Sequence, residues 1–275
     1  MDSLTSETGR RRSWKGKEML KILTCFKWVV DEADIKIDAG SRRLILDRVS
    51  YKISPYDRNA VEEAMHLQEQ HGAGVAAVTV APPTAKSCLK DVLSRGPEKA
   101  YFINDPSFAD LDPLQTSGVL AAAIQGNIEF DLIICGEGSS DLYTQQVGPV
   151  LAEKLGISCA TYVNKLTYVE NENRIVAERK LDDGIEAVSI PLPALITVLP
   201  DINTPRIPSL KQVLGAAKKP VENITLDKLG RSFDACLQTT GVLAATMDRR
   251  HLKFSAQPEE IGSLIKALVK DGVIA

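Results

Sequence analysis

The densest group of residues suited to ligand binding follows an apolar run that starts at Phe130 and ends at Cys135. The run is interrupted only by Asp131, which fits a strand buried on both faces of a parallel sheet. After it come Gly136, Glu137, Gly138, Ser139, Ser140 and Asp141, and then Thr144, Gln145, Gln146 and Val147. Hydroxyl groups, glycines and the free amides ahead of a helix can bind phosphate. We therefore expect an anion- or nucleotide-binding loop here.

No set of catalytic side chains or metal ligands is expected. The sequence has no GxSxG, HExxH or GxxxxGK[ST] motif. Glu137 and Asp141 are more typical of a solvated loop that caps a helix than of paired catalytic carboxylates. The loop lacks the third glycine of a dinucleotide fingerprint and does not follow the first strand. The 3 histidines and 5 cysteines form no CxxC or shared metal spacing, so reduced cytoplasmic thiols are expected.

Strands and helices alternate along the first half of the chain. We expect strands at 20–26, 74–80, 100–103 and 130–135, with helices after Ser54, Pro83 and Asp112 and a fourth that starts near Gln145 and ends at Gly156. This order predicts an α/β fold with a parallel sheet and right-handed crossovers. At the first helix, Ser54 is expected to cap the free amides, Pro55 to begin the helix, and Asp57 to favour its positive end.

The carboxyl ends of these strands should meet at one edge of the sheet. The first strand ends near Cys25 and Lys27, the second ends near Val80, and the segment Ser54, Pro55, Tyr56 and Asp57 opens towards the same edge. Together with the loop from Gly136, they predict an adenine-nucleotide pocket with Lys27 as a counter-charge. The alternative is a set of ordinary loops with no ligand.

The second half has a different pattern. Residues 165–169, 174–181 and 185–192 alternate polar and apolar side chains and predict an antiparallel ribbon. We divide the chain into a disordered leader at 1–18, a nucleotide-binding domain at 19–220 and a C-terminal arm at 221–275. The leader contains Arg10–Arg12, so a basic targeting segment is its alternative reading. The arm has a last amphipathic helix near 258–269 and is expected to pack on a partner.

A second candidate feature is the segment 201–210. Pro205 and Pro208 restrict it, while Arg206 and Leu210 present a basic and an apolar side chain. It is either a surface loop leading into a short helix or a docking element anchored by Leu210. The net charge of -3 gives no support for a nucleic-acid or anionic-membrane partner, and the apolar runs are too short for membrane insertion.

Taken together, these segments resemble the beta (small) subunit of electron-transfer flavoprotein, and within it the Fix-type subunits of anaerobic bacterial metabolism. The resemblance covers 19–275 and rests on Lys27, on 54–57 with 60–63, on 136–148, on 178–179 with 182–184, and on 203–210. It implies a fold similar to adenine-nucleotide hydrolases (Rossmann-like), but the function of an electron carrier, not of an enzyme.

The resemblance also implies a heterodimer with an alpha subunit, with which FAD is shared. A second nucleotide in the beta subunit would be AMP or, in bifurcating members, a second FAD. Its contacts would fall on Cys25, 54–57, Val80 and 136–147, and Leu210 would be the docking leucine. The segment Gln145-Gln146-Val147, with Gly148-Pro149, favours the second FAD.

The implied electron partners are an acyl-CoA-type or other flavoprotein dehydrogenase and a quinone oxidoreductase or ferredoxin. A basic run that follows the docking leucine in the family is reduced here to Lys218-Lys219. The alternative functions are a stand-alone AMP/ATP-binding module and a purely structural subunit.

Overall fold

The computed structural model describes residues 19–245 and 251–274, so the expected leader at 1–18 lies outside the described residues. Contacts divide the chain into two units. The first comprises residues up to 35 together with 46–240, and the second comprises 36–45 together with 241–275. All the candidate site residues belong to the first unit.

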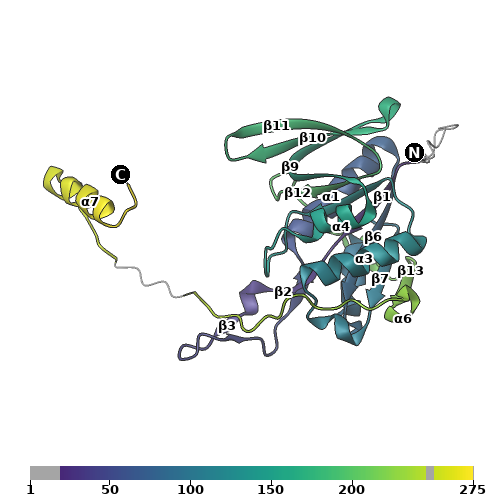
Figure 1. Ribbon diagram of the computed structural model, residues 1–275, viewed down its shortest axis with the longest axis horizontal. Helices are drawn as coiled ribbons and strands as arrows, with labels where there is room; N and C mark the ends of the chain where they lie inside the picture. The colour runs from purple at the N-terminus through teal and green to yellow at the C-terminus, as the bar shows by residue number, and fades with distance from the viewer. Residues whose placement is uncertain (1–18, 246–250, 275) are drawn as a thin grey trace, which may run out of the picture. The chain divides into compact units, whose positions relative to one another are not determined.

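The first unit is built on a nine-stranded sheet with the order β11-β10-β9-β12-β8-β1-β6-β7-β13 (Figure 1). Its parallel strands are β1 (Lys21–Cys25), β6 (Gly74–Ala81), β7 (Lys99–Asn104), β8 (Leu132–Gly136), β12 (Ala194–Val198) and β13 (Val221–Thr225). Strand β9 (Ser158–Val169) runs parallel to β12, and then β10 (Arg174–Leu181) and β11 (Gly184–Pro191) continue antiparallel. The expected α/β fold and antiparallel ribbon are both confirmed.

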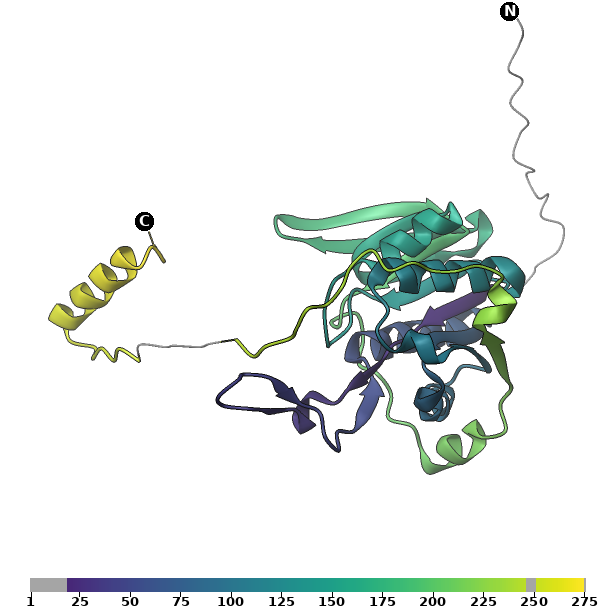
Figure 2. The same cartoon turned by 60° about the horizontal axis from the view of Figure 1, so that its bottom comes forward.

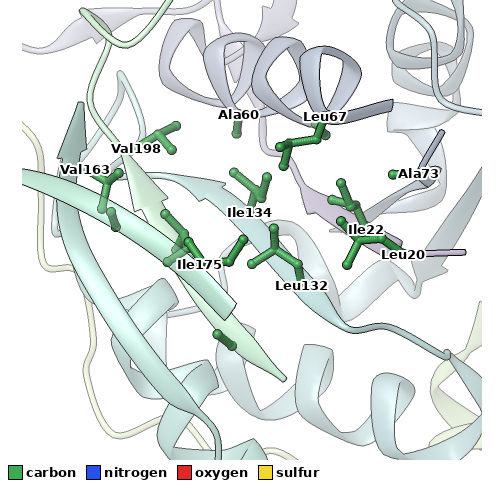
Figure 3. Close-up of a cluster of buried hydrophobic side chains, with 14 of the residues drawn as sticks. Leu20, Ile22, Ala60, Leu67, Ala73, Leu132, Ile134, Val163, Ile175 and Val198 are labelled. Atoms are coloured by element: carbon green, nitrogen blue, oxygen red, sulfur yellow. The ribbon is translucent and has the colours of Figure 1, made fainter. Parts of the chain in front are cut away.

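Helices cover both faces of the sheet because its central strands are apolar on both sides. Helices α1 (Pro55–His71) and α2 (Cys88–Ser94) pack on one face, and α3 (Pro113–Asn127) and α4 (Val147–Leu155) on the other. Alternate residues divide accordingly: Ile134 packs under α1, whereas Ile133 packs under α3 and α4. Figure 3 shows Ala60 and Leu67 pointing from α1 towards Ile134. The doubly wound arrangement brings the strand ends to one edge.

Two short segments differ from the expectation. Residues 28–30 form β2 (Trp28–Val30), which pairs with β5 (Tyr51–Ile53) where an irregular connection was expected. Residues 221–225, expected to begin the arm, instead form β13 at the sheet edge opposite the ribbon (Figure 2). Val221 and Ile224 are half-buried and the other residues of β13 are exposed, so its apolar pattern is weak.

The remaining elements of this unit are short. They are α5 (Leu210–Ala216), α6 (Leu226–Leu229), and the 3-10 turns η1 (Glu32–Asp34), η2 (Pro83–Ser87), η3 (Pro106–Ala109) and η4 (Glu170–Glu172). Helix α5 packs beside α2, where Ala216 joins the apolar cluster of α2.

The second unit contains a small hairpin and the last helix. Strands β3 (Lys36–Ile37) and β4 (Leu44–Ile45) pair antiparallel, so the strand expected at 43–49 is shorter. Arg43 forms a bridge with Leu243, and the Ala244 amide donates to the Arg42 carbonyl at 2.9 Å. Helix α7 (Pro258–Lys270) confirms the expected amphipathic helix. Among the described residues, no helix is both long and apolar enough to cross a bilayer.

Candidate functional site

The four loops expected to converge do so at the carboxyl edge of the central strands. Strand β1 pairs in parallel with β6 on one side and with β8 on the other, with Cys25 level with Val78 and Thr24 level with Ile134. Val80 is the penultimate residue of β6 and is half-buried beside this edge. The predicted residues of β1, β6 and β8 therefore lie in neighbouring positions, and the first turn of α1 joins them.

Asp57 holds this edge together. One of its carboxylate oxygens accepts from the Lys27 amide at 2.8 Å, and the other accepts from the Gly136 amide at 3.1 Å. Burial raises the pKa of Asp57 from 3.8 to about 7, although the two amide bonds act in the opposite direction. The Asp57 side chain therefore links the end of β1 to the end of β8. Ionising this carboxyl group costs more free energy in the folded chain than in water.

Ser54 has a different role from the one expected. In the described residues its hydroxyl makes no cap hydrogen bond to α1. Its oxygen accepts instead from the Ser140 amide at 3.3 Å, while its carbonyl accepts from the Asp57 and Arg58 amides. Pro55 does occupy the first helical position, as expected. The segment 54–57 therefore begins α1 as expected. The side chains of Ser54 and Asp57, however, accept hydrogen bonds from backbone amides of the neighbouring loops and do not cap the helix.

Lys27 is paired with the loop after β8. Its ammonium lies 2.5 Å from Asp141, whose other oxygen accepts from the Ser139 hydroxyl at 2.5 Å and the Leu142 amide at 2.9 Å. Burial raises the pKa of Asp141, but hydrogen bonds from Lys27 and Ser139 outweigh it and lower that pKa below its usual value. The lysine charge is therefore balanced within the protein, and a bound anion would depend more on backbone amides.

Glu137 is buried, which corrects the expectation of a solvated, cap-forming carboxylate. Its side chain accepts from the Thr197 hydroxyl and from the Tyr162 amide, the latter at 2.7 Å, and the residue is 3% exposed. The Glu137 amide donates to Val198 at 2.9 Å. Glu137 therefore fastens the loop to β9 and β12. A threonine within the otherwise apolar run 194–198 was the sequence signal for this contact.

The loop reaches α4 through a series of backbone amides without protein acceptors. Within residues 19–245, no acceptor is found for the consecutive amides from Thr144 to Gly148. Gln145 has a left-handed φ of 58° and Gln146 after it is right-handed, a succession of conformations that is found in anion-binding nests. Gln145 is held by a 3.0 Å bond to the Tyr162 hydroxyl. Gln146 precedes α4 directly, and Val147 begins it.

Two glycines allow close packing around this segment. A Cβ atom at Gly138 would lie 2.5 Å from the Tyr143 ring, which also packs 5.0 Å from the Tyr56 ring between centroids. A Cβ atom at Gly148 would lie 2.4 Å from the methyl carbon of Thr197, which is fully buried. Glycine at 148 therefore lets the N-terminus of α4 lie against β12.

Cys25 is buried below the carboxyl edge of the sheet and is not exposed at its surface. It is 7% exposed, and Cys135 on the adjacent strand is 6% exposed. A hydrogen bond with the Cys25 thiol, followed by burial, raises the pKa of the Cys135 thiol well above its usual value. The Cys135 side chain is therefore a neutral thiol at physiological pH.

The two predicted docking residues lie on a separate segment and behave differently. Leu210 begins α5 and is 75% exposed, with Ile207 at 92% and Leu214 at 63% beside it in sequence. Arg206 is anchored inward instead: its guanidinium pairs with Glu62 at 2.8 Å and with Glu69 at 2.8 Å. Leu210 is thus available for docking, whereas Arg206 fixes its loop to α1.

Sequence reasoning missed the residues of α1 that hold this loop. Glu62 lies 5% exposed and accepts from the amide and the guanidinium of Arg206. Asn59 donates to the carbonyls of Pro200 and Asn203 at 3.0 and 2.9 Å. Glu62 lies within the segment 60–63 that carries the resemblance, but its pattern did not indicate this partner.

Comparison with known proteins identifies the chain at the level of family. The model of the electron transfer flavoprotein domain matches residues 43–229. That range includes α1, the loop after β8, the ribbon and the segment 203–210, and it covers more than half of the chain. Members of this family are electron carriers that bind flavin, and are not enzymes in their own right. The chain belongs to the electron transfer flavoprotein family.

Proposed function

We propose that this chain is the beta (small) subunit of a heterodimeric electron-transfer flavoprotein. It would form one side of the cleft for an FAD held mostly by the alpha subunit, and it would bind a second nucleotide at its own sheet edge. Electrons would pass from an acyl-CoA-type or other flavoprotein dehydrogenase to a quinone oxidoreductase or ferredoxin. The family match supports the assignment to the electron carriers, and the geometry of the sheet edge supports the binding of a nucleotide there.

The observation that carries the proposal is the row of amides from Thr144 to Gly148, for which no acceptor is found in the described residues. Consecutive amides at the start of a helix attract a phosphate through their partial positive charge. Because Lys27 is already paired with Asp141, these amides are the main donors left at this edge. The donor set therefore fits the phosphates of AMP or of FAD.

The surrounding residues would position such a ligand without taking part in proton transfer. Asp57 and Ser54 fix the loop relative to β1 and α1, and Glu137 fixes it to β9 and β12. A flavin, when bound, supplies the electron-transfer chemistry itself, and the protein sets its position and electrostatic environment. The segment Gln145-Gln146-Val147 leads us to propose a second FAD over AMP.

The described structure offers support for the partner as well. Helix α7 presents Ile261, Ile265 and Val269 at helical spacing, and all three are exposed. An unpaired apolar stripe on a helix is usually covered by another chain. We propose that the C-terminal arm packs on the alpha subunit.

Co-expression of the full chain with an alpha subunit of the family tests the proposal. We expect a yellow heterodimer that releases about two FAD per complex on denaturation, one from the cleft shared with the alpha subunit and one from the beta subunit. One FAD and one AMP per complex would keep the beta-subunit assignment and replace the second flavin by AMP. A colourless monomer would contradict the proposal, and a heterodimer with an empty beta subunit would assign it a purely structural role.

A further inference from the structure

A cavity of about 540 Å³ opens beside the first turns of α1, away from the loop after β8. Its polar lining comprises Arg58, Arg95 and Arg206 with Asn59, Asn203 and Thr204, and its apolar walls are four prolines and Ile207. This size is in the range of pockets that hold small organic molecules. The cavity lies within the first unit and shares only Pro55 with the predicted nucleotide site.

Two of the three arginines are already paired. Arg206 forms a fork with Glu62 and also contacts Glu69. Arg95 pairs with Asp91 at 2.9 Å and donates to the Arg206 carbonyl at 3.4 Å. These contacts fix two walls of the cavity but leave little hydrogen-bonding capacity for a ligand.

Arg58 is different. Its Nε atom is buried and has no hydrogen-bond partner in the described chain. Burial, and then the positive charge of Arg95, lower the pKa of Arg58. The nearest carboxylates on neighbouring elements are engaged elsewhere: Asp31 and Glu32 with Lys52, and Asp91 with Arg95. They attract Arg58 only at longer range, so its donors have no protein acceptor among the described residues.

We propose that this cavity binds a carboxylate carried on a short aliphatic chain, with the carboxylate paired to Arg58. A guanidinium offers two parallel N–H groups that match the two oxygens of a carboxylate. The proline and isoleucine walls suit an aliphatic body. One unpaired guanidinium balances a single negative charge, so a carboxylate fits better than a phosphate dianion. Its source is either a free organic acid or a glutamate side chain of a docking protein.

The two sources have separate probes, and neither probe depends on the proposed electron carrier function. Butyrate represents a free acid, and N-acetylglutamic acid amide represents a protein side chain. Titration of each into the full chain, followed by calorimetry at constant ionic strength, measures binding directly. Tighter binding of butyrate supports a free acid, and tighter binding of the blocked glutamate supports a docking protein.

Arg58→Gln is the decisive variant. We expect it to weaken carboxylate binding at least about tenfold, a typical loss for one charge-assisted pair, with Arg58→Lys intermediate because it keeps the charge without the fork. Arg231→Gln is the matched control, since it removes a positive charge outside this cavity. Arg58→Gln should fold normally because Arg58 makes no hydrogen bond through Nε that would be lost; a melting curve checks this. Equal binding by wild type and Arg58→Gln, no binding of either acid, or tighter binding of inorganic phosphate would overturn the proposal.

Discussion

Asp57 provides the most direct test of how the sheet edge is held together. Its folded-state pKa is about 7 against an ordinary 3.8, so between these pH values the folded chain holds a proton that the unfolded chain has lost. The free energy of unfolding therefore falls as pH rises through this window and levels off above about 7. Between pH 5 and pH 8 the loss due to this residue is about 3 kcal/mol, using about 1.4 kcal/mol per pKa unit.

Asp57→Asn removes this titration and keeps the size of the side chain. Its oxygen can still accept one amide, but its NH₂ group would face the other amide as a donor, which costs about 1–3 kcal/mol. At pH 5 we expect the variant to be less stable than wild type by that amount. At pH 8 the difference should disappear or reverse, because only the wild type carries the buried charge.

Urea unfolding of the full chain, followed by circular dichroism at pH 5, 6, 7 and 8, measures the difference. Asp183→Asn makes the same chemical change at an exposed turn and should show no pH-dependent difference from wild type. Parallel wild-type and Asp57→Asn curves across this range would refute the reasoning. That result would mean that the Lys27 and Gly136 amides fully compensate for burial of the carboxylate.

Three further predictions concern the loops. Gly148→Ala should displace the start of α4, destabilise the chain by about 1–3 kcal/mol and reduce the nucleotide retained on purification, because the new methyl meets buried Thr197. Gly126→Ala is the control and should not destabilise the chain, because outside its chain neighbours and its own helix backbone no atom lies within 4 Å of the new Cβ. Glu62→Gln should lower the free energy of unfolding by about 1–3 kcal/mol in thermal melts, because it removes the buried charge and replaces one of the two oxygens that accept from Arg206 by an NH₂ donor. An unchanged melt would show that Glu69 is sufficient to hold Arg206. Leu210→Ala should leave stability within about 0.5 kcal/mol because the side chain is 75% exposed, yet slow electron exchange with the partner dehydrogenase in stopped-flow assays; unchanged exchange at normal flavin content would remove Leu210 from the docking role.

The sequence predicted elements well where periodicity and turn chemistry are local. The segment Ser54–Asp57 was correctly expected to begin a helix, because Pro55 and the apolar stripe after it have a strong local pattern. The partners of Ser54 and Asp57 were not predictable in the same way. Both side chains bind amides far along the chain, at Ser140 and Gly136, and those contacts depend on how β1 and β8 pair.

Edge strands and buried polar residues were harder to predict from the sequence, because they too depend on contacts with distant segments. Strand β13 has only one partner strand and a mostly exposed surface, so it needs few apolar residues and its pattern is weak. Glu137 looked solvated because glycines and serines surround it in sequence. Its burial depends on Thr197 and Tyr162, which reach it from β12 and β9.

Three buried carboxylates explain how the sheet edge and the segment 203–210 can have acidic neighbours without forming an active site. Buried carboxylates beside a predicted ligand site are often a sign of catalysis. Here, however, each one accepts bonds from groups that hold a loop: Asp57 from two strand-end amides, Glu137 from Thr197 and Tyr162, and Glu62 from Arg206. Their oxygens are therefore occupied in positioning the backbone. An electron carrier must hold its cofactor in a fixed position. Carboxylates that connect separate loops make the binding site rigid enough to do so.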